Sequence, residues 1–95
     1  MSSLRRIRKA ARERRVELSD HALDEMDNDL LRLADIRAVL LGGALRKSAV
    51  DDPRGPRYVI RGGIDHDDVE VVCRFIESDI LWVITVYVVG EVEDD

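Results

Sequence analysis

The pattern of apolar and polar positions changes its period near residue 43. Before that point, apolar residues recur every three to five positions, which is typical of helices that bury one side. After it, apolar and polar residues alternate in short runs bounded by Gly, Pro and Asp, which is typical of β-strands. The sequence therefore predicts an α+β fold in which two to three N-terminal helices pack on one face of a three- to four-stranded antiparallel sheet.

The helical part of the chain divides into three segments. Residues 3–15 combine one thin apolar stripe with many arginines, which predicts a weakly anchored, basic helix. Ser19 provides an N-cap oxygen for a second helix, and the acidic run 27–29 interrupts that helix. A third helix begins near Leu33, and we expect the glycine pair 42–43 to end it in the left-handed conformation.

The remaining chain predicts strands joined by short connections. A segment rich in Asp, Pro and Gly separates the first strand from the second, and the later connections are short enough for hairpins. We therefore expect an antiparallel meander. The predicted strands are residues 44–50, 57–62, 68–76 and 80–89.

Side chains alternate between the two faces of a sheet, and this alternation separates an apolar face from a mixed one. We expect the apolar face to pack against the helices through Phe75, Trp82 and Ile84, among others. The mixed face is consistent with an ordinary solvated surface and equally with an anion site, since guanidinium groups bind phosphate in a bidentate manner. Its polar residues include Arg57, Arg61, Arg74, Thr85 and Tyr87.

Composition supports a single domain over residues 1–95. We expect a basic N-terminal helix over 1–16, an α+β core over 17–89 and an acidic tail over 90–95. Charged residues make up 37% of the chain, against about 25% in an average protein. The first 15 residues contain seven basic and one acidic side chain, yet the whole chain has a net charge of −5. This overall acidity argues against a general nucleic-acid coat protein.

Several classes of protein are excluded by residue usage. The single cysteine, Cys73, cannot form an internal disulfide, and its place in an apolar alternation predicts a buried, inert thiol. No spacing of Cys and His residues is typical of a metal site, and no glycine-rich phosphate loop is present, so we expect neither a metal nor a cofactor. The apolar run 80–90 is about half the length that a bilayer requires, and no signal peptide is recognisable, which predicts a cytoplasmic protein without a membrane partner.

Five short segments, taken in order, match a known bacterial pattern. They are residues 18–26 (Leu-Ser-Asp-His-Ala-Leu-Asp-Glu-Met), Asp35-Ile36, Gly42, Arg57-Tyr58, and residues 83–87 (Val-Ile-Thr-Val-Tyr). The chain thereby resembles the family called domain of unknown function 4258, over most of its length. In two positions it departs from the family pattern, because Glu25 and Asp29 stand where arginines are usual.

That family is similar to the RelE, BrnT and MqsR toxins, and the resemblance implies a RelE-toxin-like scaffold that cleaves messenger RNA without metal. An antitoxin protein, and RNA or the ribosome, would be its partners. Metal-free cleavage needs proton transfer and cations that stabilise the phosphorane. The resemblance implies catalytic roles for His21, Arg57 and Tyr87, with substrate binding by Arg61, Arg74 and Thr85.

Two interpretations remain open from the sequence. The first is a metal-independent endoribonuclease of a toxin–antitoxin module. The second is a non-catalytic module that keeps the same sheet and binds a partner protein, which the reversed charges at Glu25 and Asp29 favour. For His21, a residue four positions before Glu25 on one helix face, an exposed or capping role is the alternative to proton transfer.

Overall fold

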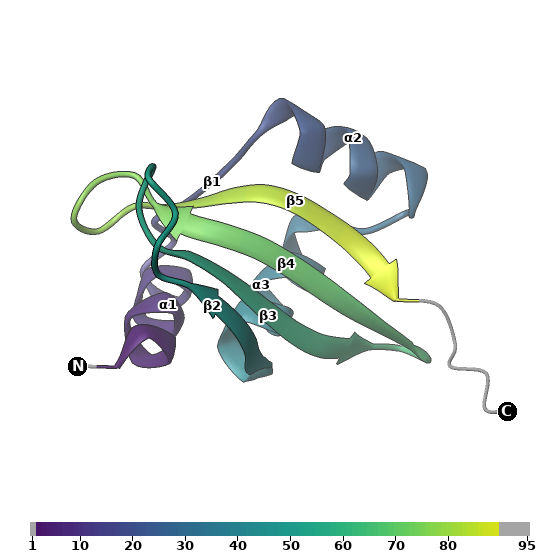
Figure 1. Ribbon diagram of the computed structural model, residues 1–95. Helices are drawn as coiled ribbons and strands as arrows, with labels where there is room; N and C mark the ends of the chain where they lie inside the picture. Colours follow the sequence, from purple (N-terminus) through teal and green to yellow (C-terminus); the bar gives the residue numbers. More distant parts are fainter. Residues whose placement is uncertain (1, 90–95) are drawn as a thin grey trace, which may run out of the picture.

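The computed structural model describes residues 2–89 and confirms the α+β class (Figure 1). Within these residues, three helices accompany one five-stranded sheet with the strand order β1-β5-β4-β3-β2. The predicted acidic tail, residues 90–95, lies outside the described residues. In chain order the elements are α1 (Ser3–Arg12), β1 (Val16–Leu18), α2 (Asp20–Asn28), α3 (Leu33–Gly42), β2 (Ala44–Ala49), β3 (Arg57–Ile64), β4 (Asp67–Phe75) and β5 (Leu81–Val89).

The sheet is mixed and has more strands than the three or four antiparallel ones that the sequence predicts. The helix expected over residues 3–15 ends at Arg12, and Arg14 then takes a positive φ of 60° that redirects the chain. Residues 16–18 form β1, which pairs in parallel with β5 from Leu81 onward. This pairing satisfies backbone groups along an edge of β5 that would otherwise be open. The helices are therefore not all N-terminal to the sheet, because β1 separates α1 from α2.

Ser19 caps α2, as its sequence position predicts, and also ties this helix to the sheet. Its side chain accepts a hydrogen bond from the backbone N–H of Ala22 at 2.9 Å and donates one to the carbonyl of Ile84 at 2.7 Å. The backbone N–H of Ser19 bonds to the carbonyl of Val83 at 3.0 Å. The start of α2 is therefore fixed to the middle of β5.

The core lies between the helices and one sheet face, and no helix of residues 2–89 covers the opposite face (Figure 1). Cys73 is fully buried in this core, as predicted, and burial raises the pKa of its thiol to about 12. Such a thiol stays protonated and inert at neutral pH. The fully buried aliphatic side chains include Ile7 from α1, Ile36 and Leu40 from α3, and Ile60, Val71 and Val86 from the sheet.

A β-bulge in β5 overturns part of the predicted assignment of faces. The pairing of β4 with β5 shifts register between Val72 and Cys73, which leaves Ile84 as the extra residue. Because one extra residue reverses the alternation, Leu81 and Val83 face the helices and are fully buried, whereas Trp82 and Ile84 face the other side. The expectation that Trp82 and Ile84 pack against the helices is therefore wrong. The partly buried side chain of Phe75 packs against the core as expected.

The end of α3 also differs from its prediction. Gly43 has φ −80° and ψ 175°, which is extended rather than left-handed backbone. A side chain cannot be accommodated here, because a Cβ atom on Gly43 would lie 2.6 Å from the carbonyl oxygens of Arg61 and Val39. Glycine is needed for close packing between the end of α3 and β3, and a left-handed turn plays no part.

The bulge generates a stability test that uses two leucines. Leu81→Ala removes a fully buried side chain and should lower the free energy of unfolding by about 2–5 kcal/mol in urea titrations. Leu30→Ala deletes the same atoms from a side chain that is 87% exposed, and should change stability by less than about 0.5 kcal/mol. Equal effects for the two variants would contradict the face assignment of β5.

Candidate functional site

The sheet face away from α1 and α3 is here called the open face (Figure 1). A groove of about 450 Å³ lies on it. We call it the open-face groove. All four of the longer strands contribute to it, which brings together residues spread over more than forty positions of the chain. Its lining residues are Arg46, Lys47 and Ala49 from β2, Arg57 and Val59 from β3, Glu70 and Val72 from β4, and Ile84, Thr85 and Tyr87 from β5.

Two β-bulges shape the two sides of the open-face groove. In β2 the register shifts between Leu45 and Lys47, so Arg46 is an extra residue and joins its neighbour Lys47 in the lining. In β5 the extra residue is Ile84, which lines the groove together with Thr85. Bulges redirect side chains in this way and are common beside active sites.

Charge in the groove is divided between its two sides. The β2–β3 side contributes three cations, Arg46, Lys47 and Arg57, and the β4–β5 side contributes Glu70 and the phenol of Tyr87. Because β3 separates Lys47 from Glu70, a ligand in the groove meets cations on one side and a carboxylate on the other. This arrangement suits an anionic group that carries a hydroxyl next to it.

Tyr87 and Glu70 form a hydrogen-bonded pair across β4 and β5. The phenol of Tyr87 donates to Oε1 of Glu70 at 2.5 Å. This hydrogen bond, followed by partial burial and the nearby negative charge, raises the pKa of Tyr87 above its usual value of 10.0. Tyr87 is therefore a neutral hydrogen-bond donor at neutral pH and cannot act as a base there.

Glu70 is held from a second side by Arg61. Nη1 of Arg61 lies 3.7 Å from Oε2 of Glu70, and its Nη2 lies 3.1 Å from Oδ2 of Asp68. Both oxygens of the Glu70 carboxylate consequently face a donor or a cation, and 15% of its side chain remains accessible. The carboxylate has lone pairs left to accept a proton or a further hydrogen bond.

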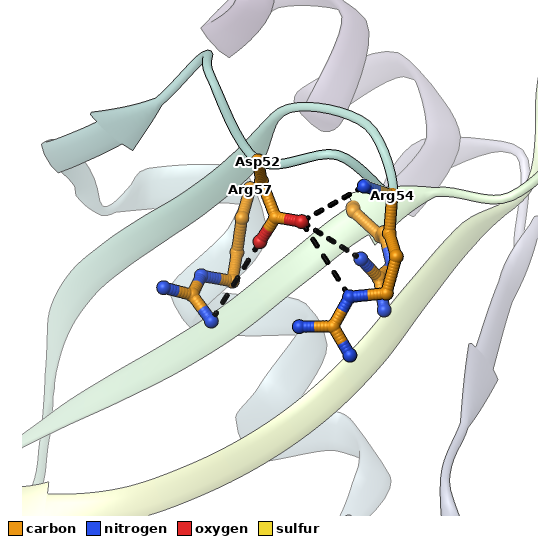
Figure 2. Close-up of polar contacts among 4 residues, drawn as sticks. Asp52, Arg54 and Arg57 are labelled. Atoms are coloured by element: carbon orange, nitrogen blue, oxygen red, sulfur yellow. Dashed lines mark hydrogen bonds and ion pairs between the residues drawn. The ribbon is translucent and has the colours of Figure 1, made fainter.

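A second polar cluster lies beside the groove, in the connection between β2 and β3. Asp52 accepts a hydrogen bond from the backbone N–H of Arg54 and faces the guanidinium groups of Arg54 and Arg57 (Figure 2). The backbone hydrogen bond and these two cations hold the pKa of Asp52 below its usual value, against the effect of burial. Oδ1 of Asp52 also lies 3.9 Å from Nη1 of Arg74.

The structure brings together three of the six residues that the sequence suggests for a site. Arg57, Thr85 and Tyr87 line the open-face groove. Arg61 stands behind Glu70, and Arg74 is largely buried with its guanidinium over the ring of Trp82, 5.5 Å from the ring centre. All three predicted arginines do share the open face.

His21 is not brought to these residues. It lies in the first turn of α2 with 64% of its side chain exposed, 3.9 Å from Glu25, and it does not line the groove. This position matches the alternative that the sequence left open, in which His21 is an exposed residue of the helix.

Four polar residues of the site carry no role in the sequence prediction. Alternation along β4 places Glu70 on the same face as Arg74, so the face that Glu70 occupies can be predicted from the sequence. Its hydrogen bond with Tyr87 cannot be predicted, because that contact depends on the register between β4 and β5. Lys47 and Arg46 reach the groove only through the bulge in β2, and Asp52 lies in a connection with no periodic signal.

Within residues 2–89, no helix has the length and apolar character needed to cross a membrane. The same part of the chain holds no group of three or more His, Cys, Asp or Glu side chains arranged to bind a metal ion.

Comparison with known proteins identifies a family. The family model described as "Domain of unknown function (DUF4258)" matches residues 18–88, about three quarters of the chain. This match runs from Leu18, the last residue of β1, through nearly all of β5 and includes every residue that lines the groove. Neither a curated protein nor a solved structure matches the chain.

The Tyr87–Glu70 hydrogen bond predicts a measurable titration. The difference in tyrosinate absorbance between the wild-type protein and Tyr87→Phe isolates this phenol from Tyr58, and should give a pKa above 10.0. Glu70→Gln should lower that pKa, because an amide carries no charge to oppose ionisation. The hydrogen bond stabilises the fold fully below the unfolded-state pKa and is lost as the pH rises through the raised folded-state pKa. A pKa at or below 10.0 in the wild-type protein would contradict the pairing.

Proposed function

We propose that this chain, which belongs to the family described as "Domain of unknown function (DUF4258)", is a cytoplasmic, metal-independent endoribonuclease that cleaves messenger RNA. One observation carries the proposal: a single groove holds three cations on one side and a hydrogen-bonded carboxylate–phenol pair on the other. Toxin-type cleavage of RNA needs these two components and no cofactor.

Arg57, Arg46 and Lys47 would bind the phosphate to be cleaved. Arg57 comes from β3, in the middle of the open face, and 42% of its side chain is exposed. Among the described residues its nearest carboxylate is that of Asp52, at 3.9 Å, which is longer than a charge-assisted hydrogen bond of about 2.7–2.9 Å. A phosphate oxygen therefore competes well for its guanidinium group.

Glu70 would act as the general base. Its carboxylate lies in the groove and is positioned from two sides by Tyr87 and Arg61. A carboxylate at this place removes the proton from a ribose 2′-hydroxyl when the adjacent phosphate binds to the cations. Tyr87 is a neutral phenol with a single O–H, so it holds the Glu70 carboxylate until Glu70 takes up the proton and then donates its hydrogen bond to a non-bridging phosphate oxygen.

The reaction proceeds by transfer within the RNA strand. The 2′ oxygen forms a bond to phosphorus as its proton moves to Glu70, and the bond between phosphorus and the 5′ oxygen breaks. The ammonium group of Lys47, on the opposite side of the groove, gives its proton to the leaving 5′ oxygen. The products are a 2′,3′-cyclic phosphate and a 5′-hydroxyl end, and water restores both side chains.

A second function is favoured by the ion pairs of the arginines. Arg57, Arg61 and Arg74 each face a carboxylate of this chain, which reduces the charge they offer to RNA. A non-catalytic member of the family that binds an antitoxin-like partner protein would use the same sheet in this form.

Substitution of groove residues tests the enzyme. Arg57→Ala and Glu70→Gln should each reduce messenger RNA cleavage by about 10²–10³-fold, because each removes a group that acts in the transition state. Rates are measured with purified protein, with and without ribosomes, and a chelator should not change them. Arg14→Asn removes one exposed cation from a turn and keeps a residue that tolerates its positive φ, so it serves as the matched control.

Two further variants assign the roles. Tyr87→Phe keeps the ring and removes only the hydroxyl, so reduced cleavage reports the hydrogen bond rather than packing. His21→Ala should leave cleavage unchanged, since His21 does not line the groove. If the wild-type protein leaves RNA intact both with and without ribosomes, the enzyme is excluded and the partner-binding module replaces it.

A further inference from the structure

Three arginines surround the carboxylate of Asp52, which lies in the connection between β2 and β3. We call Asp52, Arg54, Arg57 and Arg74 the Asp52 cluster. Only 7% of the Asp52 side chain is exposed, and its carboxylate oxygens lie 3.5 Å from Nε of Arg54 and 3.9 Å from both Nη1 of Arg57 and Nη1 of Arg74 (Figure 2). The cluster is therefore a compact group of one negative and three positive charges.

Hydrogen-bond donors in the Asp52 cluster greatly exceed acceptors. Each guanidinium group carries five N–H donors, whereas an ionised carboxylate offers about four acceptor sites. One of those sites is already used by the backbone N–H of Arg54 at 2.9 Å. The guanidinium contacts at 3.5–3.9 Å are all longer than a good charge-assisted hydrogen bond of about 2.7–2.9 Å. Asp52 thus holds the arginines together without saturating them.

Arg74 shows this lack of acceptors most clearly. Its side chain is only 9% exposed, and its buried Nη1 atom has no hydrogen-bond partner among the described residues. Buried polar atoms are normally hydrogen-bonded, so an unpartnered guanidinium nitrogen needs an explanation. The ring of Trp82 fixes the guanidinium in place from one side, which keeps Nη1 directed toward the cluster. An anionic ligand with several oxygens would complete the missing contacts.

The Asp52 cluster is continuous with the open-face groove. Arg57 belongs to both, since it lines the groove and also faces Asp52. Arg54 lies in the connection three residues before Arg57, which begins β3, and exposes 69% of its side chain. A ligand that follows this path needs anionic groups at successive positions, which is the chemistry of a single-stranded polynucleotide.

We infer that Arg54, Arg57 and Arg74 form a second phosphate subsite, which binds the phosphate next to the one held in the open-face groove. Asp52 is a positioning residue of this subsite, because its carboxylate keeps the three cations close together in the free protein. The inference rests on the proposed function for the identity of the strand, and it defines the substrate as a polynucleotide with at least two consecutive phosphates.

Uncleavable DNA probes test the subsite separately from catalysis. Single-stranded thymidine oligonucleotides lack the 2′-hydroxyl, and probes with one or with three internucleotide phosphates differ in whether they reach past Arg57. The wild-type protein should bind the longer probe more tightly. Arg54→Ala should weaken binding of the longer probe by about tenfold and flatten its logarithmic salt dependence by about 0.7, with the short probe unaffected.

Arg14→Asn provides the matched control, since it also removes one exposed positive charge and should leave both affinities unchanged. Arg54 is suitable for substitution because its exposed side chain contributes little to the core. Circular dichroism of the variant verifies its folding. The single tryptophan, Trp82, stacks with Arg74, so its fluorescence should change when the longer probe binds and much less with the short one.

The outcomes separate the subsite from the proposed enzyme. Arg54-dependent binding of the longer probe supports the subsite even if RNA cleavage is never observed. Equal affinity of wild-type protein and Arg54→Ala for the longer probe overturns the subsite, while cleavage that depends on Glu70 would still support the enzyme. If the wild-type protein binds neither probe, the subsite is overturned and a protein partner becomes the better explanation of the groove.

Discussion

The pairing of β5 with β4, with its single bulge at Ile84, is the constraint on which the rest of the structure depends. Before the bulge, Leu81 and Val83 are buried against the helices, and after it Val86 takes over that role. The change of phase turns Trp82 toward Arg74 and keeps Tyr87 opposite Glu70 on the open face. Without the extra residue, one half of β5 would have to expose its apolar side chains.

Electrostatics on the open face follow from this arrangement, because the strands bring together charges that are distant in the chain. Asp52 and Glu70 each accept a hydrogen bond on one side and face a cation on the other, so both carboxylates are held in place while neighbouring cations keep unused donors. A chain with a net charge of −5 thereby presents a locally cationic groove. Negative charge elsewhere limits non-specific attraction to nucleic acid, so binding depends on the shape of the groove.

Element types were predictable because they depend on local periodicity, whereas the site depends on register. The strands and the Ser19 cap carry strong local signals, and alternation correctly groups Arg57, Arg61 and Arg74 on one face. A bulge has no such signal, so simple alternation places Trp82 and Ile84 on the wrong face and does not indicate that Arg46 is part of the groove. The sequence does not predict β1, because Val16 continues the apolar stripe of the preceding helix and the three-residue strand forms only by pairing with the edge of β5.

The segment that carries much of the family resemblance has a structural role more than a chemical one. Ser19 donates a hydrogen bond to β5, and Ala22 and Met26 are the buried residues of α2. These three residues therefore place α2 against the strand that carries Tyr87. Glu25 and Asp29, the two departures from the family pattern, do not line the open-face groove. Their reversed charge therefore leaves the groove's cations and its Glu70–Tyr87 pair intact. Family membership accounts for the scaffold, and the chemistry of this chain has to be sought on strands β2 to β5.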